Sequence, residues 1–329
     1  MAKLVTIYGG AGFVGRYIAR RMAKEGWRVR VAVRRPNESL HVKPYGAVGQ
    51  VEPVLCNIRD DASVRAAMQG ADAVINCVGV LTERGKNSFA AVQAEGAGRI
   101  ASIATELGVP NLVHISAIGA DKAAQSEYAR TKAEGEAAVL DAFPSAVILR
   151  PSVIFGTEDA FFNKFAKMAA KIPFVFYLVG GNTKFQPVYV DDVAQAAVAG
   201  ALGAAPAGIY ELGGPDVDTL KGMVSKMLEM IRRRRLIINL PFWVGRIMAT
   251  GFSIAQFLTA GLFHNSILTK DQLKNLAVDN VVSGGAKGFD DLGIKPTSMS
   301  VILEDYLWVY RPHGQFEAVR ESAKGLRDV

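Results

Sequence analysis

The chain contains little cysteine. Only two of its 329 residues are cysteines, and both Cys56 and Cys77 stand in apolar runs typical of strands. Two such thiols exclude a disulfide framework and give no support to a metal cluster, so we expect a protein of a reducing compartment that binds no metal. Because half of the residues are hydrophobic, the chain can bury a sizeable core without such links. We predict that both thiols belong to that core.

Repeats and low-complexity blocks are also missing, and we expect no leader segment. The formal net charge of +7 suits an acidic partner, an anionic membrane surface or a phosphorylated ligand, and does not choose among them. No motif that combines aromatic and basic residues accompanies this charge, so we do not expect a nucleic-acid partner. The first predicted strand starts by Lys3 and leaves no room for a presequence, which indicates a cytoplasmic protein.

A glycine-rich turn follows the first apolar run of the chain. Residues 5–8 are largely apolar, Gly9, Gly12 and Gly15 follow, and apolar residues then recur at helical spacing. The pattern predicts a strand, a tight turn and a helix. The first glycine lets the chain turn, the second lets a pyrophosphate approach the backbone, and the third lets the helix pack on the strand. We expect phosphates on the amides of the helix start, the alternative being a turn without a ligand.

A basic pair ends the second predicted strand, residues 29–33. Dinucleotide-binding folds contact the adenosine ribose at the position held here by Arg34 and Arg35. A carboxylate there would accept hydrogen bonds from a 2′-hydroxyl, whereas arginine offers charge and paired donors to a 2′-phosphate. The pair therefore predicts NADP(H) in preference to NAD(H), with Arg16 adding to the same phosphate site. The alternative is an exposed basic strand end.

Strands and helices continue to alternate after this point. We expect strands at 51–60, 71–79 and 111–116 and helices at 62–69 and 89–107. Alternation of this length is typical of a doubly wound α/β fold, in which a parallel sheet has right-handed crossovers and helices on both faces. The ligand of such a fold lies across the carboxyl ends of the strands.

Tyr128 and Lys132 share one face of the next predicted helix. A lysine in this position can lower the pKa of the phenol by its charge and bind the nicotinamide ribose, so that Tyr128 could exchange a proton beside a hydride transfer. The spacing is common by chance, but it is specific when it follows a strand that ends in Ser116. His114, inside that strand, is predicted to be a core residue and not a catalytic one.

These motifs resemble those of the extended, or atypical, short-chain dehydrogenase/reductase family. The similarity extends to Asn57 and Ile58, in the place of an adenine-contacting pair, and to the stretches 149–156 and 186–194. It implies a Rossmann-type parallel sheet with a smaller C-terminal α/β domain that closes over the nicotinamide. The residues that it implies for binding NADPH are Gly9, Gly12, Phe13, Val14, Gly15, Arg16, Arg34, Arg35, Asn57, Ile58, Cys77, Val78, Gly79, Ser116, Tyr128, Lys132 and Pro151.

One departure from the family bears on activity. Catalytic members end the fifth strand in two hydroxyl residues, the second of which orients the substrate, and here the pair is Ser116 and Ala117. The resemblance then implies a site that holds NADPH but turns it over poorly, with Ser116, Tyr128 and Lys132 as vestigial candidates and no catalytic residue. A shift of the register by one residue would instead restore Ser116 as the third catalytic group.

More narrowly, the chain resembles the family of nucleotide-binding accessory subunits of respiratory complex I, the proton-pumping NADH:quinone oxidoreductase. This similarity rests on the stretches 114–121, 156–163, 268–273, 279–282 and 291–297. It implies a peripheral subunit with NADPH as a structural, non-redox ligand, which binds other complex I subunits where the hydrophilic arm meets the membrane. We expect a bacterial version on the cytoplasmic side of the inner membrane. The alternative is a stand-alone NADP-dependent reductase, epimerase or dehydratase.

The second half of the chain is less regular. We expect a dinucleotide-binding domain at 1–204, with an excursion near 157–185, a smaller domain at 205–312 and a peripheral tail at 313–329. Four arginines, 232–235, precede a weakly charged apolar segment that reaches 263. Polar residues and a proline argue against a membrane span, and the remaining alternatives are a core helix and an amphipathic helix that docks on a membrane surface or a partner.

Overall fold

The computed structural model describes residues 2–258 and 269–316, and these form two compact units. The first unit consists of residues 2–152, 190–213 and 282–296, and the second of the other described residues. All residues predicted to bind the dinucleotide lie in the first unit.

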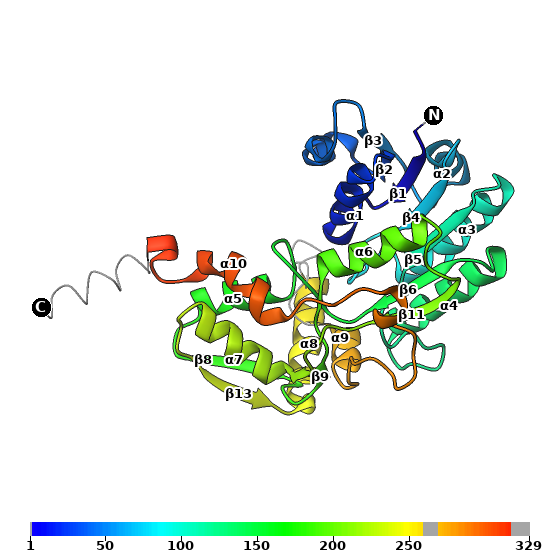
Figure 1. Ribbon diagram of the computed structural model, residues 1–329. Coiled ribbons are helices and arrows are strands. Elements are labelled where there is room, and N and C mark those ends of the chain that lie inside the picture. The colour runs from blue at the N-terminus through cyan, green and yellow to red at the C-terminus, as the bar shows by residue number, and fades with distance from the viewer. Residues whose placement is uncertain (1, 259–268, 317–329) are drawn as a thin grey trace, which may run out of the picture. The chain divides into compact units, whose positions relative to one another are not determined.

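The first unit is built on a parallel sheet of seven strands (Figure 1). Its spatial order is β11-β6-β5-β4-β1-β2-β3, so the chain leaves β1 toward one edge and later returns to pair β4 on the other side of β1. This confirms the predicted doubly wound α/β fold. The strands are β1 (Leu4–Tyr8), β2 (Arg28–Val33), β3 (Val51–Leu55), β4 (Ala73–Asn76), β5 (Asn111–Ile115), β6 (Val147–Pro151) and β11 (Gly208–Leu212).

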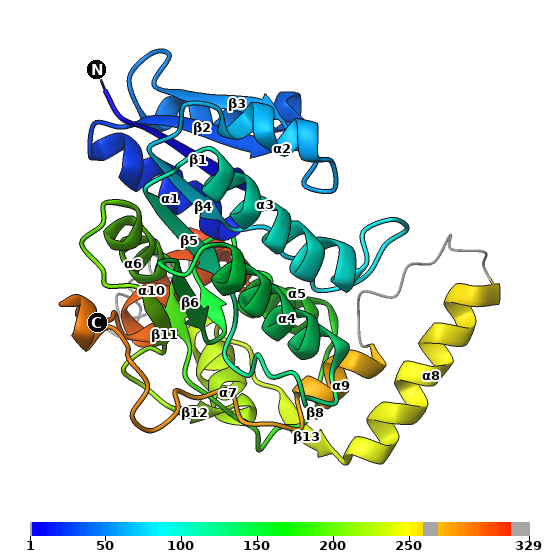
Figure 2. The ribbon, with the colours of Figure 1, turned by 90° about the vertical axis from the view of Figure 1, so that its right-hand side faces the viewer.

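Helices cover both faces of this sheet (Figure 2). On one face lie α1 (Phe13–Lys24) and α6 (Val190–Ala201), and on the other lie α2 (Asp61–Met68), α3 (Glu95–Glu106) and α4 (Glu127–Ala142). Shorter helical segments are η1 (Pro36–Tyr45), η2 (Ala90–Ala94) and η3 (Asp290–Leu292). The central strands β1, β4, β5 and β6 are buried on both sides, which is why their sequences are apolar runs with little alternation, whereas β2 and β3 keep exposed residues such as Arg28 and Glu52.

Two elements of the first unit differ from the sequence-based expectation. The third strand ends at Leu55 and not at residue 60, because the Asn57 carbonyl accepts the Asp60 amide in a turn and Asp60 then caps α2. The seventh strand, β11, was not predicted. It pairs in parallel with β6, whose residues precede it by about sixty positions, so its partner is not visible in the local pattern.

The second unit has a core rich in phenylalanine, which includes Phe155, Phe162 and Phe176. Its helices are α5 (Phe162–Lys171), α7 (Leu220–Met230), α8 (Phe242–Leu258), α9 (Lys270–Asn275), α10 (Met299–Leu307), η4 (Trp308–Tyr310) and η5 (Gly314–Phe316). Its strands pair two by two: β7 (Ile154–Phe155) with β10 (Val188–Tyr189), β9 (Lys184–Phe185) with β12 (Asp218–Thr219), and β8 (Val175–Val179) with β13 (Leu236–Leu240).

The apolar segment after the four arginines is a strand followed by a helix. Its first residues form β13, which was not expected, and α8 follows. Among the described residues, no helix is both long and apolar enough to cross a membrane. Residues 259–263 of this segment, Leu268 of the stretch 268–273 and residues 317–329 of the predicted tail lie outside the described residues.

Candidate dinucleotide site

The glycine turn joins β1 to α1 in a conformation that requires glycine. Gly9 has φ of +75°, and a Cβ placed on it would lie 3.2 Å from Cγ2 of Val78. A Cβ on Gly15 would lie only 2.4 Å from the Gly9 carbonyl oxygen, so α1 packs directly on the turn. The first and third glycines therefore do what the spacing predicted for the backbone, a reversal of the chain and a close helix contact.

The amides at the start of α1 are not capped by a side chain. The N-cap residue is Gly12, which has no side chain to offer, and the first turn contains no acidic residue. The amides of Phe13, Val14 and Gly15 therefore point out of the helix start without a side-chain acceptor. Arg16 bends back over the turn, where its guanidinium donates to the carbonyl oxygens of Gly12 and Ala11 at 3.3 Å each. This end of the helix thus carries amide donors and a positive charge, a combination that attracts anions.

Two exposed arginines stand at the carboxyl end of β2. Both Arg34 and Arg35 are exposed, and Nη1 of Arg35 forms an ion pair with Oε1 of Glu38 at 3.0 Å. The pair is at the surface, so solvent weakens it and a bound phosphate could compete with Glu38. The predicted position beside the ribose is therefore occupied by basic side chains with no acidic residue in the strand end itself.

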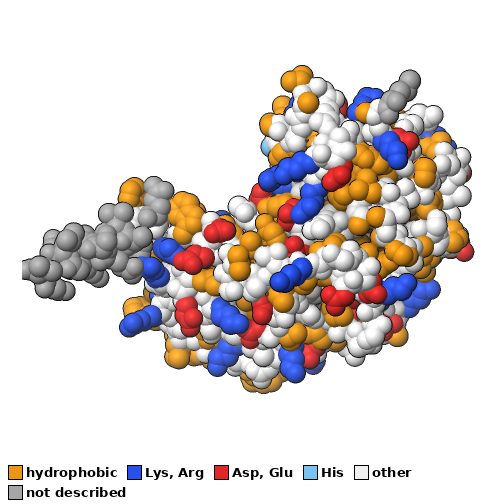
Figure 3. Space-filling model, in the orientation of Figure 1, with side chains coloured by type: hydrophobic (Ala, Val, Ile, Leu, Met, Phe, Trp, Pro, Cys, Tyr) orange, Lys and Arg blue, Asp and Glu red, His pale blue; other side chains and the backbone are white. Residues whose placement is uncertain are grey.

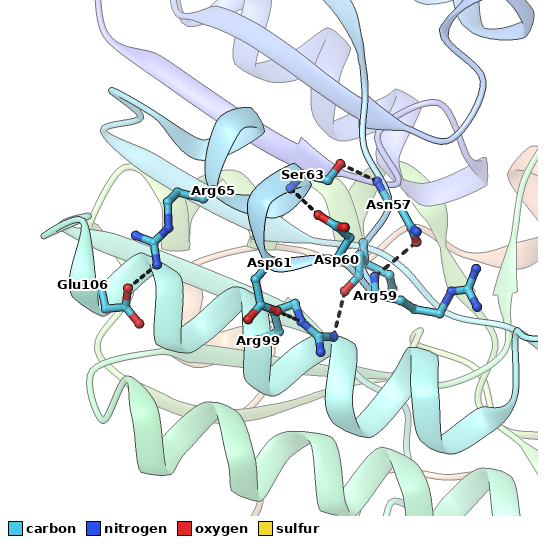
Figure 4. A network of polar contacts seen from close by, with 9 residues as sticks. Asn57, Arg59, Asp60, Asp61, Ser63, Arg65, Arg99 and Glu106 are labelled. Atoms are coloured by element: carbon cyan, nitrogen blue, oxygen red, sulfur yellow. Dashed lines mark hydrogen bonds and ion pairs between the residues drawn. The ribbon is translucent and has the colours of Figure 1, made fainter.

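A polar network fixes the corner after β3 (Figure 4). The backbone amide of Asn57 donates to Oγ of Ser63 at 2.9 Å. The backbone amide of Arg59 donates to the side-chain Oδ1 of Asn57 at 3.2 Å. Asp60 caps α2 by accepting the Ser63 amide at 2.7 Å. The Asn57 side chain is consequently held by the turn in which it stands.

The α3 helix holds the neighbouring Ile58. Nη1 of Arg99 donates to the Ile58 carbonyl at 3.0 Å, and the same guanidinium forms an ion pair with Asp61. A Cβ on Gly96 would lie 2.9 Å from Cδ1 of Ile58, so the helix can approach this side chain only because residue 96 is glycine. The corner predicted to contact adenine is therefore fixed from both α2 and α3.

The ends of β4 and β5 are joined by a buried hydrogen bond. Asn76 accepts the Val78 amide on Oδ1 at 3.0 Å, and its Nδ2 donates to Nδ1 of His114 at 3.1 Å. The His114 ring is buried, which lowers its pKa to about 3, so the imidazole is neutral with its proton on Nε2. Nε2 has no hydrogen-bond partner among the described residues. His114 is a core residue, as predicted.

Lys132 is buried at the centre of these strand ends. Its Nζ donates to the Ile115 carbonyl at 3.0 Å, and a Cβ on Gly79 would lie 3.5 Å from the same nitrogen. Burial lowers the pKa of Lys132 to about 8, while the Glu136 carboxylate opposes this shift. The ammonium therefore sits beside the loop after β4, within reach of a ribose placed over that loop.

Tyr128 differs from the expectation in one respect. Its ring packs edge-on against Phe89, with centroids 5.9 Å apart, and burial raises the pKa of the phenol to about 12. The net shift is opposite in direction to the lowering expected from Lys132, because desolvation of the phenolate dominates. The phenol is therefore protonated at neutral pH.

Ser116 and Cys77 complete the lining without offering an activated nucleophile. Ser116 directly follows β5, and its buried Oγ has no partner among the described residues. Burial raises the pKa of the Cys77 thiol to about 12. The charge of Lys132 opposes the shift of the Cys77 thiol, and the unpaired buried hydroxyl of Ser116 suits a hydrogen bond with a ligand.

The sequence did not predict the supporting roles of three residues, Arg150, Glu136 and Glu211. Arg150 on β6 forms a bidentate pair with Glu136 on α4, at 2.9 and 2.6 Å, and a longer contact of 3.5 Å with Glu211 on β11. Glu136 stands four residues after Lys132, so its place on the same helix face could have been predicted. Its partner on β6, like Asn76 opposite His114, is set by the sheet.

Taken together, these residues fit a dinucleotide. The strand ends of β1 to β5 bring the glycine turn, the basic pair, the Asn57 corner and Lys132 to one edge of the sheet, beside the point where the strand order reverses. The glycines at positions 9 and 12 keep the turn tight, since a Cβ on either would lie 3.2 Å from another protein atom, and the uncapped amides and arginines supply the positive charge that phosphates need. Pro151 closes β6, and its carbonyl accepts the Ile118 amide at 3.0 Å.

Comparison with known proteins agrees with this geometry. The chain is 37% identical over 317 residues to the mitochondrial NADH dehydrogenase [ubiquinone] 1 alpha subcomplex subunit 9 of Arabidopsis thaliana, covering 94% of this chain and 79% of that protein. It is 32% identical over 196 residues to a ceramide reductase of Caulobacter vibrioides, covering 60% of each. The fold matches that of the Bordetella bronchiseptica enzyme WbmH in complex with NAD+, with a TM-score of 0.69, 16% identity and coverage of 95% of this chain and 100% of that one.

A family model extends the comparison to a whole group of proteins. The model of the NAD dependent epimerase/dehydratase family matches residues 5–213, which include every strand of the seven-stranded sheet except the first residue of β1. This match and the identity to the Arabidopsis protein show that the chain belongs to the NAD dependent epimerase/dehydratase family, the extended short-chain dehydrogenases/reductases that its sequence resembles.

Proposed function

We propose that the chain is an accessory subunit of proton-pumping NADH:quinone oxidoreductase, complex I, and that it holds NADPH as a structural ligand. The observation that carries this proposal is the 37% identity to a subunit of NADH dehydrogenase over 94% of the chain, across both units. A likeness confined to the sheet would point only to a dinucleotide-binding domain. The identity over nearly the whole chain favours a shared place in an assembly.

The residues of the first unit would hold the cofactor in an extended form. The amides of Phe13, Val14 and Gly15 would bind the pyrophosphate, Arg34 and Arg35 the 2′-phosphate, and Lys132 the nicotinamide ribose. When bound, the cofactor supplies a nicotinamide capable of hydride transfer. It is also a ligand that binds only the native state. The second property stabilises the fold in proportion to the cofactor concentration.

The chemistry of the remaining side chains favours a non-redox role. A hydride transfer to a carbonyl needs a group that gives up a proton readily and a hydroxyl that orients the substrate. The Tyr128 phenol has its pKa raised to about 12, and Ala117 presents a methyl group where catalytic relatives carry a hydroxyl. Both features oppose turnover and leave binding unaffected.

We also propose a peripheral place for the chain, on the cytoplasmic side of a bacterial inner membrane. The relative from Arabidopsis is described as mitochondrial, and the mitochondrial inner membrane corresponds to this bacterial membrane. There the chain would support assembly and stability where the hydrophilic arm meets the membrane.

Copurification tests the proposal. A tagged chain is solubilised in a mild detergent, and the eluate is assayed for NADH:quinone reductase activity and for extracted NADPH. We expect the other subunits of the complex, quinone reductase activity and NADPH close to one per chain. Recovery of the chain alone, with no quinone reductase activity in the eluate, would contradict the assignment.

A second candidate function is an NADP-dependent reductase, epimerase or dehydratase. The 32% identity to a ceramide reductase favours it, together with the retained pair Tyr128 and Lys132. The variant Tyr128→Phe separates the two, because it removes the phenolic proton and leaves the ring contact with Phe89. For an accessory subunit, quinone reductase activity stays near that of the wild type. For an enzyme, oxidation of bound NADPH by a carbonyl substrate falls by about two orders of magnitude or more.

A further inference from the structure

The sheet formed by β8 and β13 in the second unit has an exposed apolar face. The strands are parallel and in register, with Ile238 opposite Tyr177. Alternate residues of β8, Phe176 and Leu178, are buried in the phenylalanine-rich core, so the intervening residues point outward. Tyr177 is 57% exposed and Leu236 64%. The outward residues, called the outer face below, are Val175, Tyr177, Val179, Leu236, Ile238 and Leu240.

The turn that leads into β8 holds a bulky aromatic residue in a strained backbone. Among the described residues, only Phe174 and Arg232 combine a side chain with a positive φ, at 64° and 54°. Phe174 directly precedes β8 and Arg232 stands four residues before β13, and the Leu236 amide donates to the Phe174 carbonyl at 2.9 Å. Phe174 is 80% exposed. A strained conformation that presents an aromatic ring to the surface is better explained by a binding role than by stability.

The first turns of α8 extend this apolar surface. A Cβ on Gly245 would lie 2.9 Å from Cγ1 of Val179, so the helix contacts the sheet through a glycine. Trp243 and Ile247, on the same helix, are 63% and 64% exposed. Figure 2 shows α8 running away from β8 and β13, so that its length is not used to cover them.

The two chain stretches that form the outer face carry charge of one sign, while Glu229 on α7 and Asp271 on α9 border them. The chain has no acidic residue between Asp159 and Asp191, nor between Glu229 and Asp271, and these two stretches contain both strands, α5 and α8. Arg235 donates to the carbonyls of Ile172 and Ala169 at the end of α5, while Arg234 is exposed.

A space-filling view shows the same mixture of charge and apolar surface. Basic, acidic and apolar side chains are interspersed along the lower part of Figure 3, where α7 and β13 lie in Figure 1. Basic side chains therefore stand close to the exposed apolar groups of this region, together with some acidic ones.

We propose that the outer face, with Phe174 and Trp243, docks on the surface of an anionic lipid bilayer. Apolar and aromatic side chains enter the boundary between headgroups and acyl chains, and flanking arginines bind anionic headgroups. Two separate stretches without acidic residues fit a uniformly negative surface such as an anionic bilayer. A protein partner would not need acidic residues to be missing from both stretches. The inference rests on the proposed function for placing the chain beside a membrane.

Cosedimentation of the purified full-length chain with vesicles tests the docking surface. Vesicles of phosphatidylcholine mixed with phosphatidylglycerol are compared with vesicles of phosphatidylcholine alone. The variant Tyr177→Ser/Ile238→Ser removes two apolar side chains from the outer face, and Val48→Ser, at a fully exposed valine of the first unit, is its control. Arg234→Glu reverses one charge, and Arg20→Glu, on the exposed side of α1, makes the same change in net charge. Because all five positions are exposed, the variants should fold, and NADPH-induced thermal shifts check this.

We expect the wild type to sediment with the anionic vesicles, less so at high salt, and to stay in solution with phosphatidylcholine alone. The double variant should lose binding about tenfold and Arg234→Glu at least about fivefold, since each basic residue near the surface contributes about 1 kcal/mol. The two controls should bind like the wild type. Wild type that stays in solution with anionic vesicles would overturn the proposal, as would equal losses in variants and controls. Loss of copurifying complex I subunits from the double variant, without vesicle binding by the wild type, would assign the face to a protein. Vesicle binding by a chain that copurifies with no quinone reductase would leave the docking surface standing and reject the proposed function.

Discussion

Replacing Lys132 by methionine removes a charge from the interior of the first unit and from the predicted cofactor site. The residue is 5% exposed, and its Nζ donates to the Ile115 carbonyl at 3.0 Å. Methionine has a similar length and no charge, so it fills the space. We expect the variant to be more stable than the wild type without cofactor and to lose the stabilisation that NADPH provides.

The magnitude follows from the pKa. Burial lowers the pKa of Lys132 from 10.5 to about 8, and one pKa unit corresponds to about 1.4 kcal/mol, so keeping the ammonium in the folded state costs about 3 kcal/mol at neutral pH. Leaving the Ile115 carbonyl without its donor costs about 1 to 2 kcal/mol. The cofactor-free variant should therefore gain about 1 to 2 kcal/mol in its free energy of unfolding.

The pH dependence gives a second, independent sign. The folded-state pKa lies below the unfolded one, so between them the unfolded chain binds more protons and the wild type becomes more stable as pH rises. Methionine has no such dependence. The difference in stability between variant and wild type should thus change by roughly 2 to 3 kcal/mol between about pH 7 and about pH 10, so that the wild type becomes the more stable of the two at the higher pH.

Urea denaturation at several pH values, with and without NADPH, measures both effects. The variant Lys122→Met, at an exposed lysine in the loop before α4, is the matched control and should behave like the wild type. At a hundredfold excess over its dissociation constant, NADPH should stabilise the wild type by about 2.7 kcal/mol and Lys132→Met by much less. A variant less stable than the wild type at neutral pH, or equally stabilised by NADPH, would refute the reasoning about this buried charge.

Three further predictions concern the glycine turn, the basic pair and the buried histidine. Gly15→Ala places a Cβ 2.4 Å from a backbone oxygen and should abolish NADPH binding in equilibrium dialysis, whereas Gly284→Ala, whose Cβ meets open space, should not. Arg34→Ala/Arg35→Ala should weaken NADPH by about 2 to 6 kcal/mol in calorimetric titrations and leave NADH nearly unchanged, and equal losses for both would contradict the 2′-phosphate site. Since the pKa of His114 is lowered to about 3, stability should fall as pH drops below about 6.5, by about 1.4 kcal/mol per pH unit relative to His114→Gln. Parallel pH profiles of wild type and variant would argue against a neutral buried imidazole.

Much of the first unit follows from local sequence. The glycine spacing dictates a turn because only glycine tolerates the φ of Gly9 and the contact made by Gly15, and both requirements act within a dozen residues. The central parallel strands can be predicted from their apolar runs, because both of their faces are covered. Residues that follow these runs, such as Asn57 and Ser116, could be assigned to one edge of the sheet, since parallel strands place their carboxyl ends together.

What the sequence by itself could not supply depends on partners far along the chain. Nothing near residue 208 shows that β11 pairs with β6, and nothing near Leu236 shows that β13 pairs with β8, because each contact is made across a long loop. Burial is also a property of the whole fold. The motif around Tyr128 suggested a phenol activated by a lysine, but packing against Phe89 and loss of water raise its pKa instead. The sequence thus determined which residues meet at the carboxyl edge of the sheet, and the tertiary structure decided their charge states and left Tyr177, Leu236 and Ile238 exposed, because desolvation and long-range pairing exist only once the chain is folded.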